Sequence, residues 1–493
     1  MNNEKFPAPV YAATVLTQNF ADGQRYFFPS LMHIHYAHCL MLAEQGILTT
    51  KEAKTILRGL DKLDRQRILA ARYDGTVEDL YFYVERELAS LIDPDIAGKL
   101  HIARSRNDID VTMYRMTLRE ELLALMQGLM TLRARLILLA QAHLTTVMPA
   151  HTHTQPAQPT TLAHYLSAAI EFLTRDLQRC KAAFATVNRN PLGACAITTT
   201  GFPIDRALTT SLLGFEGLQE NSYGAIGGID YLCETISVLA TSMISLGKFV
   251  QDLLLWATQE FSFIRLSDAY VQTSSIMPQK RNPVALEHAR ILCSKAYSQA
   301  IAVMTSVHNT PFGDIVDVED DLQPLVFATF GEARRVLDLL AGAVASITVD
   351  EAALQQKAAG SFLTMTELAD TLVREEKLSF KAAHHLVAQT VRQVPSLTTP
   401  HAEIVDVLQQ TARMSLGREL KTSRATLLAA LCPQNFVAVR TVPGGPAPKT
   451  VARFLRAQEK LAAQDQRWLA AKAELLAAFP QRLAAETRAR LRK

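Results

Sequence analysis

The chain has little that would mark a secreted or nucleic-acid-binding protein. Its 493 residues include only six cysteines, and none of them forms a CxxC pair. We therefore expect reduced thiols in a cytoplasmic protein rather than disulfides. The net charge is only +3, from 51 basic and 48 acidic residues spread along the chain. This balance gives no strong field for nucleic acid or anionic lipid, so the expected partners are small molecules and further copies of the chain.

Long uninterrupted apolar runs are also missing. The most apolar stretches, 118–147 and 231–256, are interrupted by charged residues such as Arg133 and Asp252. A membrane-spanning helix needs about 20 mostly apolar residues, so we predict core helices and no membrane insertion. The first twenty residues have neither a basic start nor a continuous apolar run, and no targeting segment is expected.

Helical periodicity is what the chain has instead. Between 118 and 136, leucines recur at steps of three and four, as one face of a helix requires: Leu118, Leu122, Leu125, Leu129, Leu132 and Leu136. Similar patterns cover 162–187, 231–258, 284–306 and 324–346, whereas strand-like alternation is scarce. The sequence predicts an all-α protein built on a bundle of long helices. The wide apolar faces of such helices favour a homo-oligomer.

Changes in this pattern along the chain predict three domains. An N-terminal helical domain is expected at 1–113, the central long-helix bundle at 114–364, and a small helical C-terminal domain at 365–493. The closing run 482–493 is basic. A solvated helix face is favoured there over a nucleic-acid site.

Three polar islands interrupt the helical pattern, and each carries more side-chain chemistry than a loop needs. The first island comprises Arg104, Ser105, Arg106, Asn107 and Asp108. Its guanidinium and amide groups are suited to bind carboxylates through paired hydrogen bonds. A helix start capped by Ser105 or Asn107 would use the same residues, and composition alone leaves both interpretations open.

The second island runs from His151 to Gln155 and includes Thr152 and His153. A His-x-His pair can hold a metal ion, but no third ligand stands at a suitable spacing, so no metal is expected. His153, with Thr152 and Gln155 beside it, could instead transfer a proton and fix a carboxylate. A histidine that is merely hydrogen-bonded in a loop is the alternative.

The third island, 273–283, reads Thr-Ser-Ser-Ile-Met-Pro-Gln-Lys-Arg-Asn-Pro and precedes one of the helical patterns. Lys280 and Asn282 lie near the expected helix start. They could stabilise a developing anion, because positive charge and oriented donors act where negative charge forms. An ordinary polar loop before a capped helix is the competing interpretation.

The third island resembles the Gly-Ser-Ser-x-Met-Pro-x-Lys-x-Asn-Pro signature of the fumarase and aspartase superfamily, with Thr273 in place of the usual glycine. Within that superfamily the chain is similar to the argininosuccinate lyase family. The resemblance runs from about residue 78 to residue 286 and resumes at 380. Its further motifs come in the family's order, at 98–101, 104–108, 152–153, 261–270 and 380–384.

The resemblance implies a mainly helical three-domain subunit in a homotetramer, with active sites where the three islands of different subunits meet. It implies no metal and no organic cofactor. The implied reaction is a β-elimination, in which a base removes a proton from the carbon next to a carboxylate and the neighbouring carbon–nitrogen bond breaks to leave fumarate. The family default is the cleavage of argininosuccinate to arginine and fumarate, in arginine biosynthesis in the cytoplasm.

The resemblance also implies roles for individual residues. Ser274 would be the base, on a loop that closes over the substrate, with its alkoxide stabilised by backbone donors and positive charge. Lys280 and Asn282 would hold the doubly charged carboxylate of the intermediate. His153 would be a general acid or a hydrogen-bonding partner. Substrate binding would also involve Ser105, Arg106, Asn107, Thr152 and Gln155.

Three stretches depart from the family pattern. Tyr81 stands where argininosuccinate lyases usually carry histidine, and 227–230 reads Gly-Gly-Ile-Asp in place of Ser-Glu-Arg-Asp. The segment 312–321 replaces a Tyr-Asn-Lys-Asp-Leu-Gln stretch and has gained acids. In the family these stretches help to hold the amino-acid end of the product. The chain is therefore predicted to keep the chemistry with a changed leaving group, and the five acids of 314–321 favour a cationic amine.

Other functions stay open on the sequence alone. The same elimination could act on another N-substituted aspartate, such as a diamine linked to succinyl groups. This family has also been recruited as a non-enzymatic lens crystallin, but the presence of Ser274, Lys280, Asn282 and His153 together speaks against loss of activity. A metal hydrolase using His151 and His153 would require a bound metal.

Overall fold

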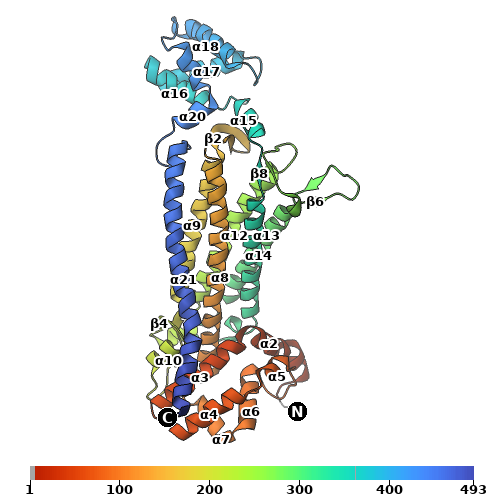
Figure 1. The fold of residues 1–493 in the computed structure, drawn as a ribbon, viewed down its shortest axis with the longest axis vertical. Helices are drawn as coiled ribbons and strands as arrows, with labels where there is room; N and C mark the ends of the chain where they lie inside the picture. The colour runs from red at the N-terminus through yellow and green to blue at the C-terminus, as the bar shows by residue number, and fades with distance from the viewer. Residues whose placement is uncertain (1–5, 361, 493) are drawn as a thin grey trace.

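The computed structural model describes residues 6–360 and 362–492 and shows an elongated, almost entirely helical subunit (Figure 1). Short helices form the lower end of the molecule in this view. They are α1 (Pro9–Tyr11), α2 (Thr17–Asp22), α3 (Phe28–Glu44), α4 (Thr50–Lys62), α5 (Arg65–Ala70), α6 (Leu80–Leu91) and α7 (Pro94–Gly98), with the π-helical turns η1 (Ala12–Leu16) and η2 (Gly23–Phe27) and the 3-10 turn η3 (Lys99–His101).

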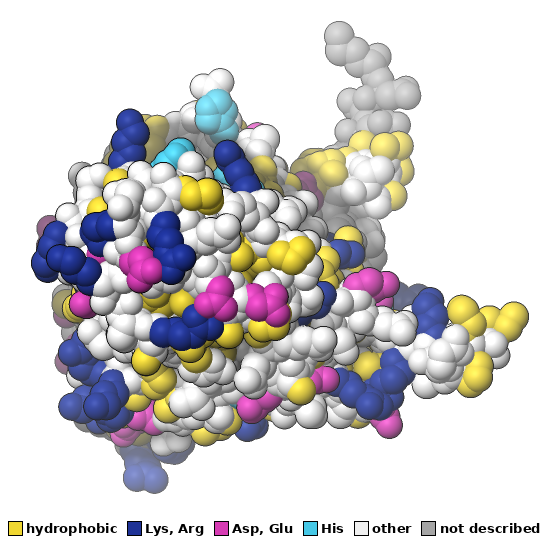
Figure 2. Space-filling model, turned by 90° about the horizontal axis from the view of Figure 1, so that it is seen from above, with side chains coloured by type: hydrophobic (Ala, Val, Ile, Leu, Met, Phe, Trp, Pro, Cys, Tyr) yellow, Lys and Arg dark blue, Asp and Glu magenta, His cyan; other side chains and the backbone are white. Residues whose placement is uncertain are grey.

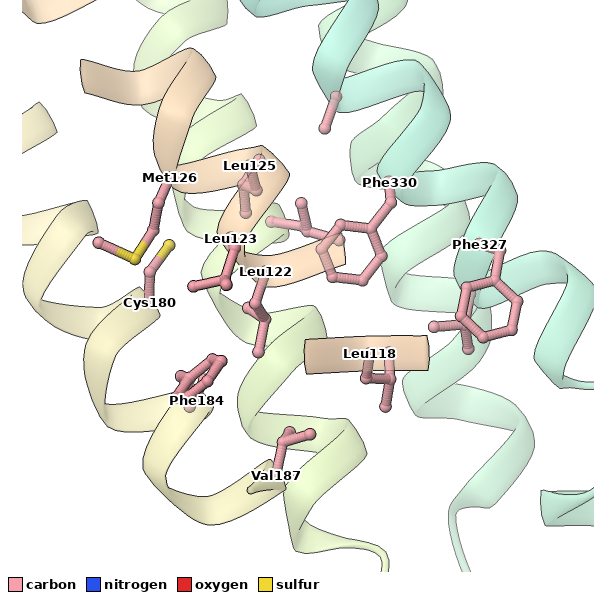
Figure 3. Close-up of a cluster of buried hydrophobic side chains, with 14 of the residues drawn as sticks. Leu118, Leu122, Leu123, Leu125, Met126, Cys180, Phe184, Val187, Phe327 and Phe330 are labelled. Carbon is pink, nitrogen blue, oxygen red and sulfur yellow. The ribbon is translucent and has the colours of Figure 1, made fainter. Parts of the chain in front are cut away.

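Long helices form the central bundle: α8 (Arg106–Ala142), α9 (Leu162–Val187), α12 (Asp230–Trp256), α13 (Val284–Val307) and α14 (Gln323–Ala345). The leucines of the predicted face are all 0% exposed. Figure 3 shows Leu118, Leu122 and Leu125 of α8 in one cluster with Phe184 of α9 and Phe330 of α14. The predicted all-α bundle is confirmed, and four predicted helical ranges differ from the observed helices by at most two residues at an end.

Two stretches of the bundle are long and apolar enough to span a membrane by composition, Arg106–Ala142 and Ser222–Trp256. In each, 56% of the most apolar window is buried inside the subunit. The first also buries Arg133, which pairs with Asp465 at 2.6 Å. Both stretches thus serve as core helices of the bundle.

Short elements connect the bundle helices. Antiparallel pairs join β1 to β2, β5 to β8 and β6 to β7, and a parallel pair joins β3 to β4. The elements are β1 (Val147–Thr152), β2 (Gln155–Thr161), β3 (Arg189–Asn190), α10 (Arg206–Leu212), β4 (Gly217–Leu218), α11 (Ser222–Gly227), β5 (Ile264–Arg265), η4 (Asp268–Tyr270), β6 (Gln272–Thr273), β7 (Arg281–Asn282), η5 (Val316–Val318) and β8 (Thr348–Val349).

A second group of helices caps the upper end of the bundle in Figure 1 and encloses a separate hydrophobic core that includes Leu368, Leu386 and Leu408. These helices are α15 (Glu351–Ala359), which leads into the cap, and α16 (Met365–Glu376), α17 (Phe380–Gln393), α18 (His401–Leu416), α19 (Arg424–Ala430) and α20 (Pro433–Ala438). The cap core and the bundle core are therefore built from different segments of the chain.

The last helix, α21 (Pro448–Arg492), returns along the bundle, so that its end lies among the N-terminal helices at the lower end (Figure 1). There Arg490 pairs with Glu44 of α3. Part of the basic closing run thus contacts the protein itself. The domain ranges 1–113, 114–364 and 365–493 stay a prediction. α8 continues across the first boundary, and α21 packs on the bundle.

Candidate active site

The first island forms the start of α8. The backbone N–H of Ser105 donates to Asp108 Oδ1 at 2.9 Å, and the Ser105 hydroxyl donates to Asn107 Oδ1 at 2.8 Å. Asp108 also accepts the backbone N–H groups of Gly193 and Cys195, at 2.7 and 2.9 Å. Burial raises the pKa of Asp108 to about 6, against the effect of these backbone donors. The helix is thus capped at Ser105, one of the two residues expected to do so.

A cavity of about 300 Å³ opens beside this helix start, lined by Phe82, His101, Ser105, Arg106, Asn107, Asp110, Asp314 and Glu319. Arg106 lies in its wall and forms ion pairs with Glu78 at 2.8 Å and Asp79 at 3.1 Å. Asp110 is not among the predicted site residues. It stands four residues after Arg106 on α8, and side chains at this spacing lie on one helix face, which is the signal that could have found it.

Arg104 does not line this cavity and is buried among the N-terminal helices, where it donates to His35 Nδ1 at 3.0 Å. Tyr81, the first departure from the family, lies beside it, and its hydroxyl is 2.5 Å from His101 Nδ1. Burial and the charge of Arg104 lower the pKa of His101, which favours the neutral imidazole. Tyr81 therefore lies behind the cavity wall and reaches the cavity through His101.

Carboxyl groups crowd together around the cavity. Burial raises the pKa of Asp110 well above its usual range, and the nearby Asp320 raises it further. Burial and a hydrogen bond with Asp314 raise the pKa of Glu319 to about 8. Burial and a neighbouring carboxylate raise the pKa of Asp320 to about 6. Burial is the largest cause of each shift, so these carboxyl groups keep their protons to higher pH than exposed acids do.

We expect the substitution Glu319→Gln to raise the melting temperature more at pH 8 than at pH 5. The pKa of Glu319 rises from 4.5 to about 8 on folding, so the folded state binds more protons between these values. The free energy of unfolding therefore falls as the pH rises through this window, and glutamine escapes the loss. Melting curves at both pH values test this, with the exposed Asp317→Asn as control. An equal shift at the two pH values would contradict it.

The second and third departures from the family contact each other. The ring of Phe312 stacks on Tyr223 of α11, with 5.7 Å between centroids. A Cβ atom at Gly227 would lie only 3.0 Å from the backbone nitrogen of Gly313. The glycine thus lets the backbone of the acidic loop approach α11 closely, and the two departures together position one wall of the cavity.

The second island forms the tight turn of the β1–β2 hairpin. Thr152 pairs with Gln155, and between them His153 and Thr154 have φ angles of 49° and 63°. Positive φ at both turn residues is usual for asparagine and glycine. For other residues it costs about 1–3 kcal/mol each, a strain that is often kept at functional sites. The residues 152–155 are all exposed. Within 6–360 and 362–492, no group of three His, Cys, Asp or Glu side chains is placed to hold a metal ion.

The third island forms an arm, residues 272–282, in which β6 and β7 pair and the loop between them projects from the side of the bundle (Figure 1). Figure 2 shows hydrophobic side chains at the end of this projection, and Ile276 is 82% exposed. The Ser274 hydroxyl oxygen accepts the backbone N–H groups of Ile276 at 3.3 Å and Met277 at 3.0 Å. Lys280 is exposed on the same arm. Two backbone donors aimed at one hydroxyl oxygen would stabilise an alkoxide.

Within one chain, the first island lies far from the other two. Ser105 precedes α8, and the hairpin with His153 follows it, so the 37 residues of this helix separate them. At about 1.5 Å per residue, that is about 55 Å. The arm with Ser274 projects from the half of the bundle that carries β2 (Figure 1). The structure therefore groups Ser105, Arg106 and Asn107 around one cavity and keeps them apart from the other predicted site residues, which are Thr152, His153, Gln155, Ser274, Lys280 and Asn282.

Comparison with known proteins identifies the family of this chain. Residues 17–297 match the family described as Lyase, and residues 362–438 match the family described as argininosuccinate lyase C-terminal. Argininosuccinate lyase 2 of Agrobacterium fabrum is 42% identical over 451 residues, which cover 91% of this chain and 89% of the relative. The chain belongs to the argininosuccinate lyase family. The argininosuccinate lyase of Methanosarcina acetivorans is 36% identical over 462 residues, which cover 93% of this lyase and 92% of the relative.

Solved structures agree with this assignment. An EDDS lyase variant with bound fumarate aligns to the lyase with a TM-score of 0.86 at 33% identity, covering 98% of this chain and 94% of that chain. The class II fumarase of Schistosoma mansoni shares the fold, with a TM-score of 0.67 at 15% identity, and covers 85% and 91% of the two chains. The protein is thus a fumarate-releasing carbon–nitrogen lyase, as the resemblance implied.

Proposed function

We propose that the lyase eliminates an amine from an N-substituted L-aspartate with Ser274 as the base. The observation that carries this proposal is the pair of backbone N–H groups of Ile276 and Met277 directed at the Ser274 hydroxyl oxygen. Such donors lower the pKa of a hydroxyl group, because they favour its charged form. Closure of the exposed arm over the substrate would exclude water and strengthen this effect.

In the proposed reaction, the Ser274 alkoxide takes a proton from the carbon next to one carboxylate. The electron pair first collects on that carboxylate, which then carries two negative charges, and Lys280 and Asn282 stabilise it. The pair next forms the carbon–carbon double bond of fumarate as the carbon–nitrogen bond breaks. His153 either protonates the departing nitrogen or binds a carboxylate. Ser105, Arg106, Asn107, Thr152 and Gln155 hold the succinyl group.

The separation of the islands supports a homotetramer with shared active sites, because a second copy can bring its arm and hairpin to the cavity beside α8. Exposed apolar side chains on α12 and α13 supply a surface for such a copy: Ile244, Leu255, Ile291, Tyr297 and Ile301. The cysteines are free, which suits a reducing compartment. We therefore infer a cytoplasmic enzyme with a small-molecule substrate.

The family default for the substrate is argininosuccinate, in arginine biosynthesis. The acidic segment 312–321 favours a second candidate, in which the same chemistry acts on another N-substituted aspartate, such as a diamine joined to succinyl groups. We expect the purified lyase to release fumarate, followed by its ultraviolet absorbance, from at least one compound in a panel with argininosuccinate, N-(aminoalkyl)-aspartates and N-alkyl-aspartates. A panel without any fumarate release would contradict the proposal.

A further inference from the structure

The cavity beside α8 is lined by more acidic than basic side chains. Asp110, Asp314 and Glu319 line it, and Arg106 is the only Lys or Arg among the described residues that do so. Arg106 is already paired with two acids of the preceding loop. In the described parts of the chain, no ion pair joins a lysine, arginine or histidine to any of the three lining acids. A cation from outside the subunit would therefore be attracted to this place.

Asp110 independently indicates that a hydrogen-bond donor enters the cavity from outside the chain. It lies on α8, a different element from the acidic loop, and is only 9% exposed although it lines the cavity. Within 6–360 and 362–492, its side chain forms no hydrogen bond or ion pair. The charge of Arg106 favours its ionised form, whereas burial and Asp320 disfavour it more strongly. A carboxylate that is largely removed from water and has no donor is costly. Such a group is expected where a ligand supplies the donor.

We propose that this cavity binds a second, positively charged amine of the leaving group, an ammonium separate from the nitrogen that is eliminated. This inference rests on the elimination proposed above and names its substrate class, the N-(aminoalkyl)-L-aspartates. An ammonium group has three N–H donors, and three carboxyl groups face this cavity, from Asp110, Asp314 and Glu319. The succinyl end of the same substrate would lie against the neighbouring Ser105 and Asn107.

A lysine of a second subunit is the competing source of positive charge. The arm carries Lys280 and Arg281, but Arg281 pairs with Asp268 and donates to the Leu266 carbonyl oxygen at 3.0 Å. Lys280 is therefore the cation that the arm can offer. The substrate brings two carboxylates of its own, and one of them gains further charge in the intermediate, so Lys280 is needed there. Lys280 is then not free for the cavity acids, and a cation on the leaving group can take this place.

The pH dependence of the preference for cationic leaving groups provides a second readout. The pKa of Glu319 is raised to about 8, so this group is largely protonated at pH 6 and largely charged at pH 9. A bound ammonium favours the charged form, so the preference for cationic over uncharged leaving groups should rise with pH across this range. The charged and titratable groups around Glu319 are Asp314 and Asp320 of its own loop, Arg106 and Asp110 of α8, and His101 of η3.

The test compares N-(aminobutyl)-L-aspartate with its uncharged isostere N-pentyl-L-aspartate, using kcat/KM for fumarate release. We expect the wild-type enzyme to prefer the cationic compound by at least about tenfold, since charge-assisted hydrogen bonds are about twice as strong as neutral ones. The preference should fall by about tenfold in Asp110→Asn, Asp314→Asn and Glu319→Gln, mainly through KM. The matched control is Asp317→Asn, which removes an exposed acid of the same loop that does not line the cavity.

The outcomes separate this inference from the proposed elimination. Equal kcat/KM values for the two compounds in the wild-type enzyme would overturn the inference, as would an unchanged preference in variants that keep the native oligomer size. Fumarate from the pentyl compound alone would also overturn it, would assign the acids to Lys280 of a second copy, and would leave the elimination intact. Fumarate from argininosuccinate alone would overturn the N-(aminoalkyl)-L-aspartate class, although arginine carries an ammonium of its own, and would leave the elimination intact. No fumarate from any of these substrates would overturn both.

Discussion

The substitution Ser274→Ala is expected to lower kcat for fumarate release by about 1,000-fold, within the range of about 10²–10⁴ that general-base catalysis contributes. The Ser274 hydroxyl oxygen accepts the backbone N–H groups of Ile276 and Met277, which favour its charged form. KM should change little, because the groups proposed to bind the succinyl end lie on other elements. Steady-state kinetics with any productive N-substituted aspartate measure both effects.

The neighbouring Ser275→Ala provides the matched control. It removes the same hydroxyl group one residue further along the same exposed loop, and it should keep most of the wild-type kcat. The pattern expected is therefore a large loss at one serine and a small one at the next. A kcat for Ser274→Ala within about tenfold of the wild type would exclude this residue as the base.

Mixing two inactive variants is expected to restore activity. If each site takes its arm from one subunit and its α8 cavity from another, a hybrid of Ser274→Ala and Arg106→Ala subunits contains some sites with both parts intact. In an equal random mixture, about one quarter of the sites should be of this kind. Co-expression of the two variants with different tags, followed by purification over both, yields the hybrids, and the rate of fumarate release measures the restored sites.

A second mixture tests whether subunit sharing causes this gain. Ser274→Ala and Lys280→Ala remove two groups from the same arm, so no exchange of subunits can rebuild an intact arm. This mixture should stay as inactive as its parents. Hybrids of the first pair that are no more active than either parent would show that the site lies within one subunit, in spite of the length of α8.

Much of the bundle could be predicted from the sequence, because its helices carry long regular apolar faces. The leucines between 118 and 136 are fully buried, and the end residues of α9 and α13 agree closely with the predicted ranges. The β1–β2 hairpin is harder to predict. Pro149 and Pro159 face each other in it, and proline disfavours strands except where a strand lacks a neighbour on one side, as in a two-stranded ribbon.

The residues that line the cavity could be predicted from the sequence only in part, for a different reason. Ser105 and Asn107 stand out as a polar group at a helix start. The structure shows that Ser105 caps the helix and that both residues line the cavity. Asp110 looks like any polar residue within a helical pattern. In the structure it lies near Asp320, on a loop about 200 residues away in the chain. A local sequence pattern cannot predict a contact between segments so far apart in the chain. The roles of the island residues also stay predictions.

The chain leaves the bundle through α15 and comes back in α21, so the cap with its own core is an insertion between two bundle helices. Its residues coincide closely with the separate family match at 362–438. A module attached in this way can gain, lose or replace residues without shifting the packing of the helices below it. The cap is thus the part of the subunit in which evolution can vary sequence and length at the least cost to the geometry of the bundle.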